Sequence, residues 1–177
     1  MIETARLHLR PFTDGDRDWS AAQAADPVVM AHLGGPQTRG KSDDRISYMM
    51  AMQAERGHSF WVMETKADRT RIGICGLKIF DAEGAPLPGE IEIGWRLDPR
   101  SWGQGYAREA ATASLDFAFG RLDAPRVVSI TSQANKASWG LMERLGMTRR
   151  PDLDFQDPRF PDAPTIVYLI EAATWIR

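Results

Sequence analysis

The chain of 177 residues is short of cysteine, histidine and long apolar runs, and each shortage excludes a class of protein. Cys75 is alone, so an internal disulfide is impossible, and a reducing cytoplasm suits such a chain. The three histidines (8, 32 and 58) are scattered without ligand spacing, so we expect no metal. No stretch approaches the roughly 18 apolar residues of a membrane span, and the first residues lack an apolar leader. We therefore expect a cytoplasmic protein without membrane contact.

The chain also lacks an excess of charge of either sign. Its 22 lysines and arginines against 24 acidic residues give a formal net charge of −2. Since binding to nucleic acid needs a basic surface that displaces counterions, we expect no nucleic-acid partner. With 43% hydrophobic and 26% charged residues, the composition is that of an ordinary globular protein. No linker or repeat divides the chain, so we expect a single domain over residues 1–177.

Hydrophobic periodicity predicts how the chain alternates between strands and helices. Strands are expected at 4–10, 59–65, 71–80, 90–98, 126–131 and 165–170. Helices are expected from Asp14 or Asp16 to 25, and at 42–56, 105–120 and 136–145. The links within 59–98 are too short to hold crossover helices, so these strands form an antiparallel meander. The predicted fold is α/β: one mixed, mostly antiparallel central sheet of about six to seven strands, flanked by helices on both faces.

A glycine-rich turn between the strand 90–98 and the helix 105–120 is the most informative local feature. It reads Arg100-Ser101-Trp102-Gly103-Gln104-Gly105-Tyr106-Ala107. The free N–H groups of the first helical turn converge there, and the helix dipole adds positive potential. The two glycines let a bulky anion approach the backbone without meeting a Cβ atom. The turn therefore predicts a site for a di- or polyphosphate group.

Three segments together resemble the GNAT family of N-acetyltransferases, and most of all its branch that acetylates the amino termini of ribosomal proteins. They are Thr4-x-Arg6-Leu7-x-Leu9-Arg10-Pro11, Arg100-x-x-Gly103-x-Gly105, and Asn135-x-x-Ser138 followed by Leu145-Gly146-Met147. The resemblance covers residues 4–170. It implies acetyl-coenzyme A as the donor co-substrate and a primary amine as the acceptor, either a protein amino terminus or a small molecule. It also implies direct attack in a ternary complex and a possible homodimer.

The resemblance further implies which residues contact the coenzyme. These are Leu97, Arg100, Trp102, Gly103, Gln104, Gly105, Tyr106, Ala107, Arg108, Asn135 and Ser138. The pantetheine arm would bond the backbone near Leu97, and the pyrophosphate would lie on the N–H groups of 102–106. Arg100 and Arg108 would add charge-assisted contacts to phosphate.

Catalysis requires a group that removes a proton from the amine, and Glu92 is the candidate base or water-organiser. It shares a strand face with Glu90 and Gly94, although it could instead be a solvated strand residue or pair with Arg96. A backbone N–H within 95–97 would polarise the thioester carbonyl.

Ser138 and Asn135 are the candidates for donating a proton or hydrogen bond to the departing thiolate. Asn135 is also suited to be a helix N-cap. Met142 stands where many family members have a tyrosine, so the general acid has no candidate of the usual kind.

Two other functions compete with acetyl transfer. Gly35-Pro36-Gln37-Thr38-Arg39-Gly40-Lys41-Ser42 matches the P-loop pattern of nucleotide-binding phosphotransferases, or it is a turn with Ser42 as a helix cap. A non-catalytic acyl-CoA-binding or regulatory module is the other alternative. The acceptor cannot be identified from the sequence. The aspartates 152, 154 and 157, in a predicted loop at 151–164, would either attract a cationic amine or merely be solvated.

Overall fold

A computed structural model describes residues 1–158 and 164–175. Its strands are β1 (Ile2–Glu3), β2 (Leu7–Arg10), β3 (Phe60–Thr65), β4 (Arg71–Ile79), β5 (Ile91–Leu97), β6 (Arg126–Ser132), β7 (Thr148–Arg149) and β8 (Thr165–Glu171). Its α-helices are α1 (Arg17–Ala25), α2 (Arg39–Arg56), α3 (Tyr106–Arg121) and α4 (Lys136–Arg144). Short 3-10 turns are η1 (Asp14–Asp16), η2 (Pro99–Ser101), η3 (Pro151–Leu153) and η4 (Ala172–Thr174). Within these ranges, no helix is both long and apolar enough to cross a bilayer.

All the strands belong to one sheet, in the order β1-β2-β3-β4-β5-β6-β8-β7. Every neighbouring pair is antiparallel except β5 and β6, so the predicted meander of β3, β4 and β5 is confirmed. The sheet has eight strands rather than the expected six to seven. The difference arises because β1 and β7 have two residues each, too few to produce an alternating pattern.

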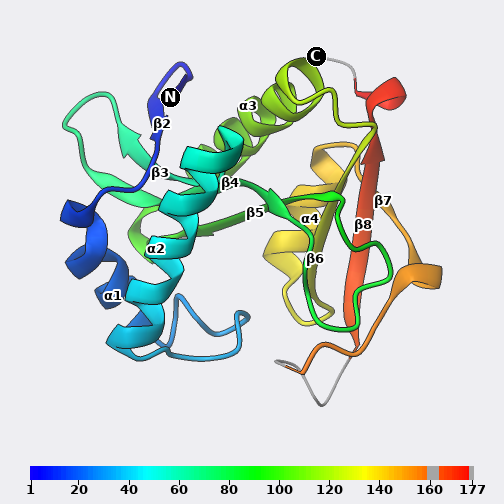
Figure 1. The fold of residues 1–177 in the computed structure, drawn as a ribbon, viewed down its shortest axis with the longest axis horizontal. Coiled ribbons are helices and arrows are strands. Elements are labelled where there is room, and N and C mark those ends of the chain that lie inside the picture. Colours follow the sequence, from blue (N-terminus) through cyan, green and yellow to red (C-terminus); the bar gives the residue numbers. More distant parts are fainter. Residues whose placement is uncertain (159–163, 176–177) are drawn as a thin grey trace.

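The parallel pair β5 and β6 separates soon after it forms. Only Ile91 and Glu92 of β5 are in register with β6. Just beyond, Ser129 Oγ donates a hydrogen bond to the Ile93 carbonyl at 3.0 Å. Figure 1 shows β5 running across the view while β6 and β8 run almost vertically. The second half of β5 therefore has one edge that no neighbouring strand covers.

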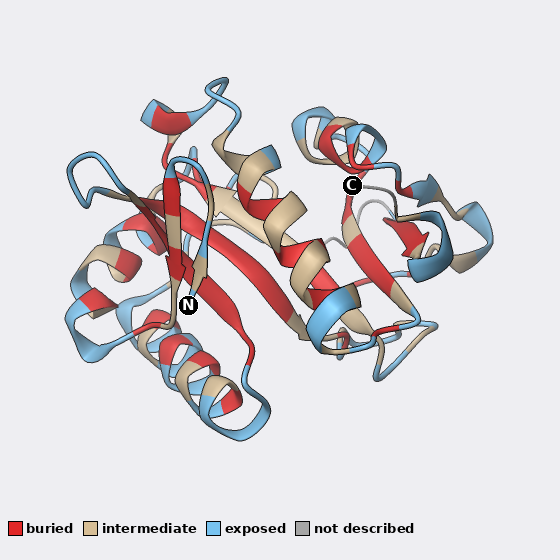
Figure 2. Cartoon of the chain, turned by 90° about the horizontal axis from the view of Figure 1, so that it is seen from above, coloured by how far each residue is buried: buried red, intermediate tan, exposed pale blue. Residues whose placement is uncertain are grey.

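Helices cover both faces of the sheet, as the sequence predicts. The main core cluster lies on the face of α3 and α4 and includes Leu77, Ile93, Leu115, Leu141 and Met142. A smaller cluster lies under α2 and includes Ile46, Met49, Phe60, Val62 and Ile74. Buried residues accordingly follow the central strands, while the outer faces of the helices are exposed (Figure 2).

The start of α2 differs from the expectation that Ser42 caps this helix. The helix begins three residues earlier, and the Thr38 side chain accepts a hydrogen bond from Lys41 N at 3.4 Å. Ser42 is buried inside the first turn, with its Oγ 3.4 Å from Ser20 Oγ. Two hydroxyl residues stand in the same segment, and the earlier one forms the cap. The predicted end is confirmed, since Gly57 adopts φ +75°.

Candidate functional site

A cleft of about 1410 Å³ opens where β5 and β6 separate. One wall combines a backbone edge of β5, the glycine-rich turn, the start of α3, β6 and the start of α4. The other wall combines α2, the loop before it, parts of β3 and β4, and the side chains of Glu92 and Arg96 from β5. The residues with predicted roles that line the cleft are Glu92, Leu97, Trp102, Gly103, Gly105, Tyr106, Ala107, Arg108, Asn135 and Ser138. The structure thus brings together most of the predicted site.

The glycine-rich turn has the backbone shape expected of an anion cradle. Gly103 and Gly105 have φ values of +72° and +79°, which side chains with a Cβ rarely adopt. The space where a Cβ of Gly103 would lie is open. The first helical hydrogen bond runs from Glu109 N to the Gly105 carbonyl at 3.1 Å. The N–H groups of residues 106–108 precede this ladder, and they border the cleft.

Two side chains of the turn are used within the turn itself. Arg100, which is 89% exposed, forms a salt bridge with Asp98 at 2.7 Å and lowers the pKa of Asp98 to about 2. The Gln104 side chain donates to the Arg100 carbonyl at 2.8 Å. Neither Arg100 nor Gln104 lines the cleft. A contact of Arg100 with phosphate would therefore require its guanidinium to leave Asp98.

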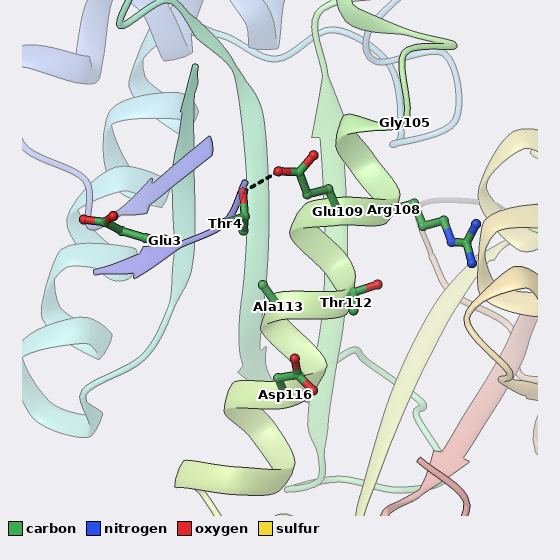
Figure 3. Close-up of a pocket in the computed structure, with 8 residues that line it drawn as sticks. All are labelled: Glu3, Thr4, Gly105, Arg108, Glu109, Thr112, Ala113 and Asp116. Atoms are coloured by element: carbon green, nitrogen blue, oxygen red, sulfur yellow. Dashed lines mark hydrogen bonds between the residues drawn. The ribbon is translucent and has the colours of Figure 1, made fainter. Parts of the chain in front are cut away.

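A clamp from the amino-terminal segment holds the start of α3. The Arg6 guanidinium stacks over the Tyr106 ring at 4.4 Å and bonds Glu109 at 2.7 Å. Thr4 donates a second hydrogen bond to Glu109, shown as a dashed line in Figure 3. The Arg108 side chain points away from Thr4 and Glu109 in the same view, and it also lines the cleft. The clamp fixes the helix start and leaves Arg108 available to a ligand.

The open edge of β5 presents backbone groups to the cleft. Asp98 N donates to the Ile72 carbonyl at 2.9 Å, so the even-numbered residues of β5 bond β4. By the alternation of antiparallel pairing, Trp95 and Leu97 direct their backbone groups to the opposite edge. The Leu97 carbonyl there accepts a hydrogen bond from Trp102 Nε1 at 3.0 Å. The N–H groups of Trp95 and Leu97 remain directed toward the cleft.

Glu92 is buried in the wall of the cleft, 8% exposed, and is held by a lysine. Lys78 Nζ lies 2.9 Å from Glu92 Oε2 and 2.6 Å from Asp81 Oδ1. Tyr48 OH donates to the same aspartate at 3.2 Å. The alternative prediction that Glu92 pairs with Arg96 is wrong. Lys78 lies directly across from Glu92 in the β4–β5 register and forms the salt bridge instead.

The lysine remains charged despite its burial. Burial lowers the pKa of Lys78, but the carboxylates of Glu92 and Asp81 outweigh that effect and raise the pKa above its ordinary value. Glu92 therefore has a fixed cation beside it that sets its orientation. Sequence reasoning missed Lys78 and Asp81 because their role depends on the strand register, which is not visible in a motif.

The predicted residues at the start of α4 differ in whether their side chains already have hydrogen-bond partners. Asn135 Oδ1 accepts from Ser138 N at 3.3 Å, and its Nδ2 donates to Thr131 Oγ1 at 3.0 Å. The interpretation of Asn135 as a helix cap is confirmed, and both ends of its amide are engaged. Ser138 lines the cleft, whereas Met142 is 1% exposed and packs in the main core.

The segment 35–42 does not have the surroundings of a P-loop. Residues 27–34 form turns rather than a strand, and residues 39–42 are the first turn of α2. The strands that follow, β3 to β5, are antiparallel. A P-loop requires parallel strands with crossover helices, so the phosphotransferase hypothesis has no structural support.

Comparisons with known proteins agree with this geometry. A family model described as an acetyltransferase (GNAT) domain matches residues 6–148. The uncharacterised protein YkkB of Bacillus subtilis is 30% identical over 147 residues, which are 82% of this chain and 84% of that protein. An acetyltransferase structure from Agrobacterium tumefaciens is 30% identical with a TM-score of 0.83, covering 96% of this chain and 93% of that one. A spermidine N-acetyltransferase from Vibrio cholerae, in complex with CoA and spermine, is 17% identical with a TM-score of 0.75 and covers 97% and 98%. This last likeness shows the fold alone.

Proposed function

Because the chain belongs to the GNAT acetyltransferase family, we propose that it transfers an acetyl group from acetyl-coenzyme A to a primary amine by direct attack in a ternary complex. One observation carries the proposal. A single cleft has a backbone anion cradle at residues 103–108 and, on β5, the buried carboxylate of Glu92. The cradle suits the donor, and the carboxylate suits the removal of a proton from the acceptor.

The residues present fit coenzyme A, which when bound supplies the acetyl group as a thioester. The N–H groups of residues 103–108 hold the pyrophosphate, and Arg108 adds a positive charge. The uncovered edge of β5 bonds the pantetheine arm as an additional strand would. A backbone N–H of Trp95 or Leu97 binds the thioester carbonyl and stabilises the negative charge that develops on its oxygen.

Proton movement is assigned to Glu92 and Ser138. An alkylammonium has a pKa of about 10.4, so the acceptor must lose a proton before it attacks. Glu92 accepts that proton directly or through a water, while Lys78 keeps the carboxylate oriented. Ser138 donates a hydrogen bond to the departing thiolate, which takes up the second proton that the nitrogen loses on acetylation, so that coenzyme A leaves as a thiol. Met142 brings no proton donor to the place where many family members have tyrosine.

Cys75 does not serve as an acetyl carrier in this proposal. Its thiol is fully buried under α3 beside Ser114 Oγ, at 3.7 Å, and burial raises the pKa of Cys75 to about 12. Such a thiol is neither ionised nor accessible at neutral pH. The Cys75→Ala variant should keep its activity, and an acetyl group trapped on Cys75 would contradict direct transfer.

A thiol-release assay tests the proposed function. The purified protein is incubated with acetyl-CoA and a panel of amines, and free coenzyme A is measured with a thiol reagent. We expect release that depends on the amine, with one acetylated product per thiol by mass spectrometry. Binding of CoA in calorimetry without turnover of any amine would favour a non-catalytic acyl-CoA-binding module.

The proposal also covers the class of acceptor, the cellular location and the oligomeric state. A protein amino terminus is one acceptor class, supported by the resemblance of Thr4–Pro11 and Asn135–Ser138 to the ribosomal-protein branch. A small-molecule amine is the other. A cytoplasmic location fits the single buried thiol. A homodimer is implied by the resemblance alone, and light scattering on the purified protein would test it.

A further inference from the structure

Arg96 is a guanidinium in the wall of the cleft without an anionic partner. Among the described residues, its buried Nε has no hydrogen-bond partner, and its Nη1 donates a weak hydrogen bond to the sulfur of Met30 at 3.6 Å. Across residues 1–158 and 164–175, no carboxylate forms a salt bridge with it. A buried charge without a partner is unfavourable, because the protein does not replace the water that the charge has lost. Such a group is expected where a ligand completes the site.

A second guanidinium lies in the same part of the cleft. Arg45 of α2 lies over the Phe60 ring at 5.8 Å and also lines the cleft. Burial, and then the positive charge of Arg45, lower the pKa of Arg96 to about 10. Arg96 is still charged at neutral pH, so the two side chains together form a positive region.

Arg96 and the candidate base Glu92 lie on one face of β5. Glu92, Gly94 and Arg96 alternate onto that face, and the outer two are about 13 Å apart along the strand. A Cβ on Gly94 would lie 2.9 Å from Phe60 Cζ, so an aromatic ring occupies the space beside this glycine. Phe60 thus forms an apolar floor between a carboxylate and a guanidinium. A small molecule with an amine and an anionic group fits this arrangement.

We propose that the acceptor is a primary amine that also carries a carboxylate, which Arg96 binds with support from Arg45. The inference rests on the proposed function and specifies its substrate class. A ligand carboxylate would form paired, charge-assisted hydrogen bonds with the guanidinium and complete its solvation. Polyamines are disfavoured, because they would bring further positive charge beside Arg96 and Arg45.

Matched acceptors test this inference. L-methionine, L-leucine and L-phenylalanine are each compared with their carboxamides in the thiol-release assay. We expect kcat/KM to be roughly 10- to 100-fold higher for the carboxylates, the range for a hydrogen bond to a charged group. The amine of a carboxamide loses its proton more easily, so amine basicity alone would produce the opposite preference.

The variant Arg96→Met tests whether the Arg96 side chain causes the preference for carboxylate over carboxamide acceptors. Methionine is apolar and fills much of the same volume, so the fold should tolerate it. We expect the KM of the carboxylates to rise until the preference is lost, with a much smaller loss of kcat/KM for the carboxamides, which accept only a neutral hydrogen bond from the guanidinium. The matched control is Arg56→Met, an exposed residue at the last turn of α2 outside the cleft, which should keep the full preference.

A second measurement does not depend on turnover. The CoA-loaded protein is melted with N-acetyl-L-methionine or with N-acetyl-L-methioninamide. We expect the acid to raise the melting temperature more, and Arg96→Met to abolish the difference. Equal shifts, no shift with either compound, or equal turnover of acids and amides would overturn the inference. Turnover without a carboxylate preference leaves the proposed function standing, whereas CoA binding without turnover of any amine contradicts that function.

Discussion

The two walls of the cleft are built by different means. The donor wall uses backbone N–H groups, two glycines with positive φ and a helix that packs on the main apolar core. The acceptor wall uses charged side chains, with Arg45 and Arg96 at one place and Lys78 with Glu92 at another. A site formed by backbone N–H groups is compatible with many sequences. A site formed by charged side chains changes with each substitution at those residues. The donor can therefore be inferred from the family, and the acceptor must be read from the individual residues.

The elements around the two walls are also stabilised differently. Asp16, just before α1, is 1% exposed and forms paired hydrogen bonds with Arg10 at 2.8 Å. It also accepts from Thr13 N at 2.8 Å and from Arg71 at 3.3 Å. These contacts connect the start of α1 to strands β2 and β4. The acceptor side thus adds a buried ion-pair network to the apolar cluster under α2, whereas the donor side adds the clamp on Glu109 to the main apolar core.

The largest expected effect is on the acceptor wall, at Glu92. We expect Glu92→Gln to lower kcat by about 100- to 1000-fold, as for loss of a general base, with activity recovering only at high pH. The change also leaves Lys78 without one of its carboxylates. Combining it with Lys78→Met separates the two effects, because a purely structural role predicts that the double variant recovers activity. Steady-state kinetics of the four proteins over pH make the comparison.

The next effect concerns the ion pairs near α1. We expect Asp16→Asn to lower the free energy of unfolding by about 2–4 kcal/mol at pH 7, because it breaks the buried carboxylate's paired bonds to Arg10 and leaves that partly buried guanidinium with Glu64 alone. Burial raises the pKa of Asp16, but the hydrogen bonds from Arg10 and Thr13 outweigh burial and hold the pKa of this carboxyl well below the ordinary value for aspartate.

The sign of the pH dependence follows from that lowered pKa. The stabilisation by Asp16 is complete above the pKa that this carboxyl has in the unfolded chain. It is lost progressively as the pH falls from that value towards the lower pKa of the folded protein. The difference in the free energy of unfolding between wild type and Asp16→Asn, measured with urea, should therefore become smaller between pH 4 and pH 2. A difference that stays constant with pH would show that the ionised carboxylate is not what stabilises this side.

A smaller effect is expected in the donor wall, at Gly105. Gly105→Ala forces a Cβ into φ +79°, and Gly57→Ala does the same at φ +75° outside the cleft. Both should cost roughly 1–2 kcal/mol of stability. Only Gly105→Ala should weaken the binding of CoA, by about 10-fold, because it alone alters the cradle. Calorimetric titration of both variants provides the check, and equal affinities would show that the turn does not hold the coenzyme.

The smallest effect is expected at Trp102. Trp102→Phe removes the indole N–H that bonds the Leu97 carbonyl and keeps most of the apolar surface. We expect a loss of about 1 kcal/mol in stability and a few-fold rise in the KM of acetyl-CoA. The kcat/KM ratio between carboxylate and carboxamide acceptors should not change. A change in that ratio would show that the two walls are not independent.

Local features were predictable from the sequence, and pairings across the sheet were not. The glycine-rich turn and the end of α2 at Gly57 depend on a few neighbouring residues, so their patterns were sufficient. The salt bridge of Lys78 with Glu92 depends on which residues of β4 and β5 face each other. The isolated state of Arg96 depends on every side chain packed around it. Part of the predicted loop 151–164, residues 159–163, lies outside the described residues, while Asp154 pairs with Arg149.

Amide hydrogen exchange with and without acetyl-CoA tests the central claim most directly, because it reports on the backbone groups that form the cradle. We expect slower exchange at residues 103–108, and at Trp95 and Leu97 on β5, when acetyl-CoA is bound. We expect less protection in segment 35–42, which has the P-loop pattern but not its geometry, although Gln37, Lys41 and Ser42 also line the cleft. Unchanged exchange across 103–108, or protection confined to 35–42, would contradict the assignment of this cleft to acetyl-CoA.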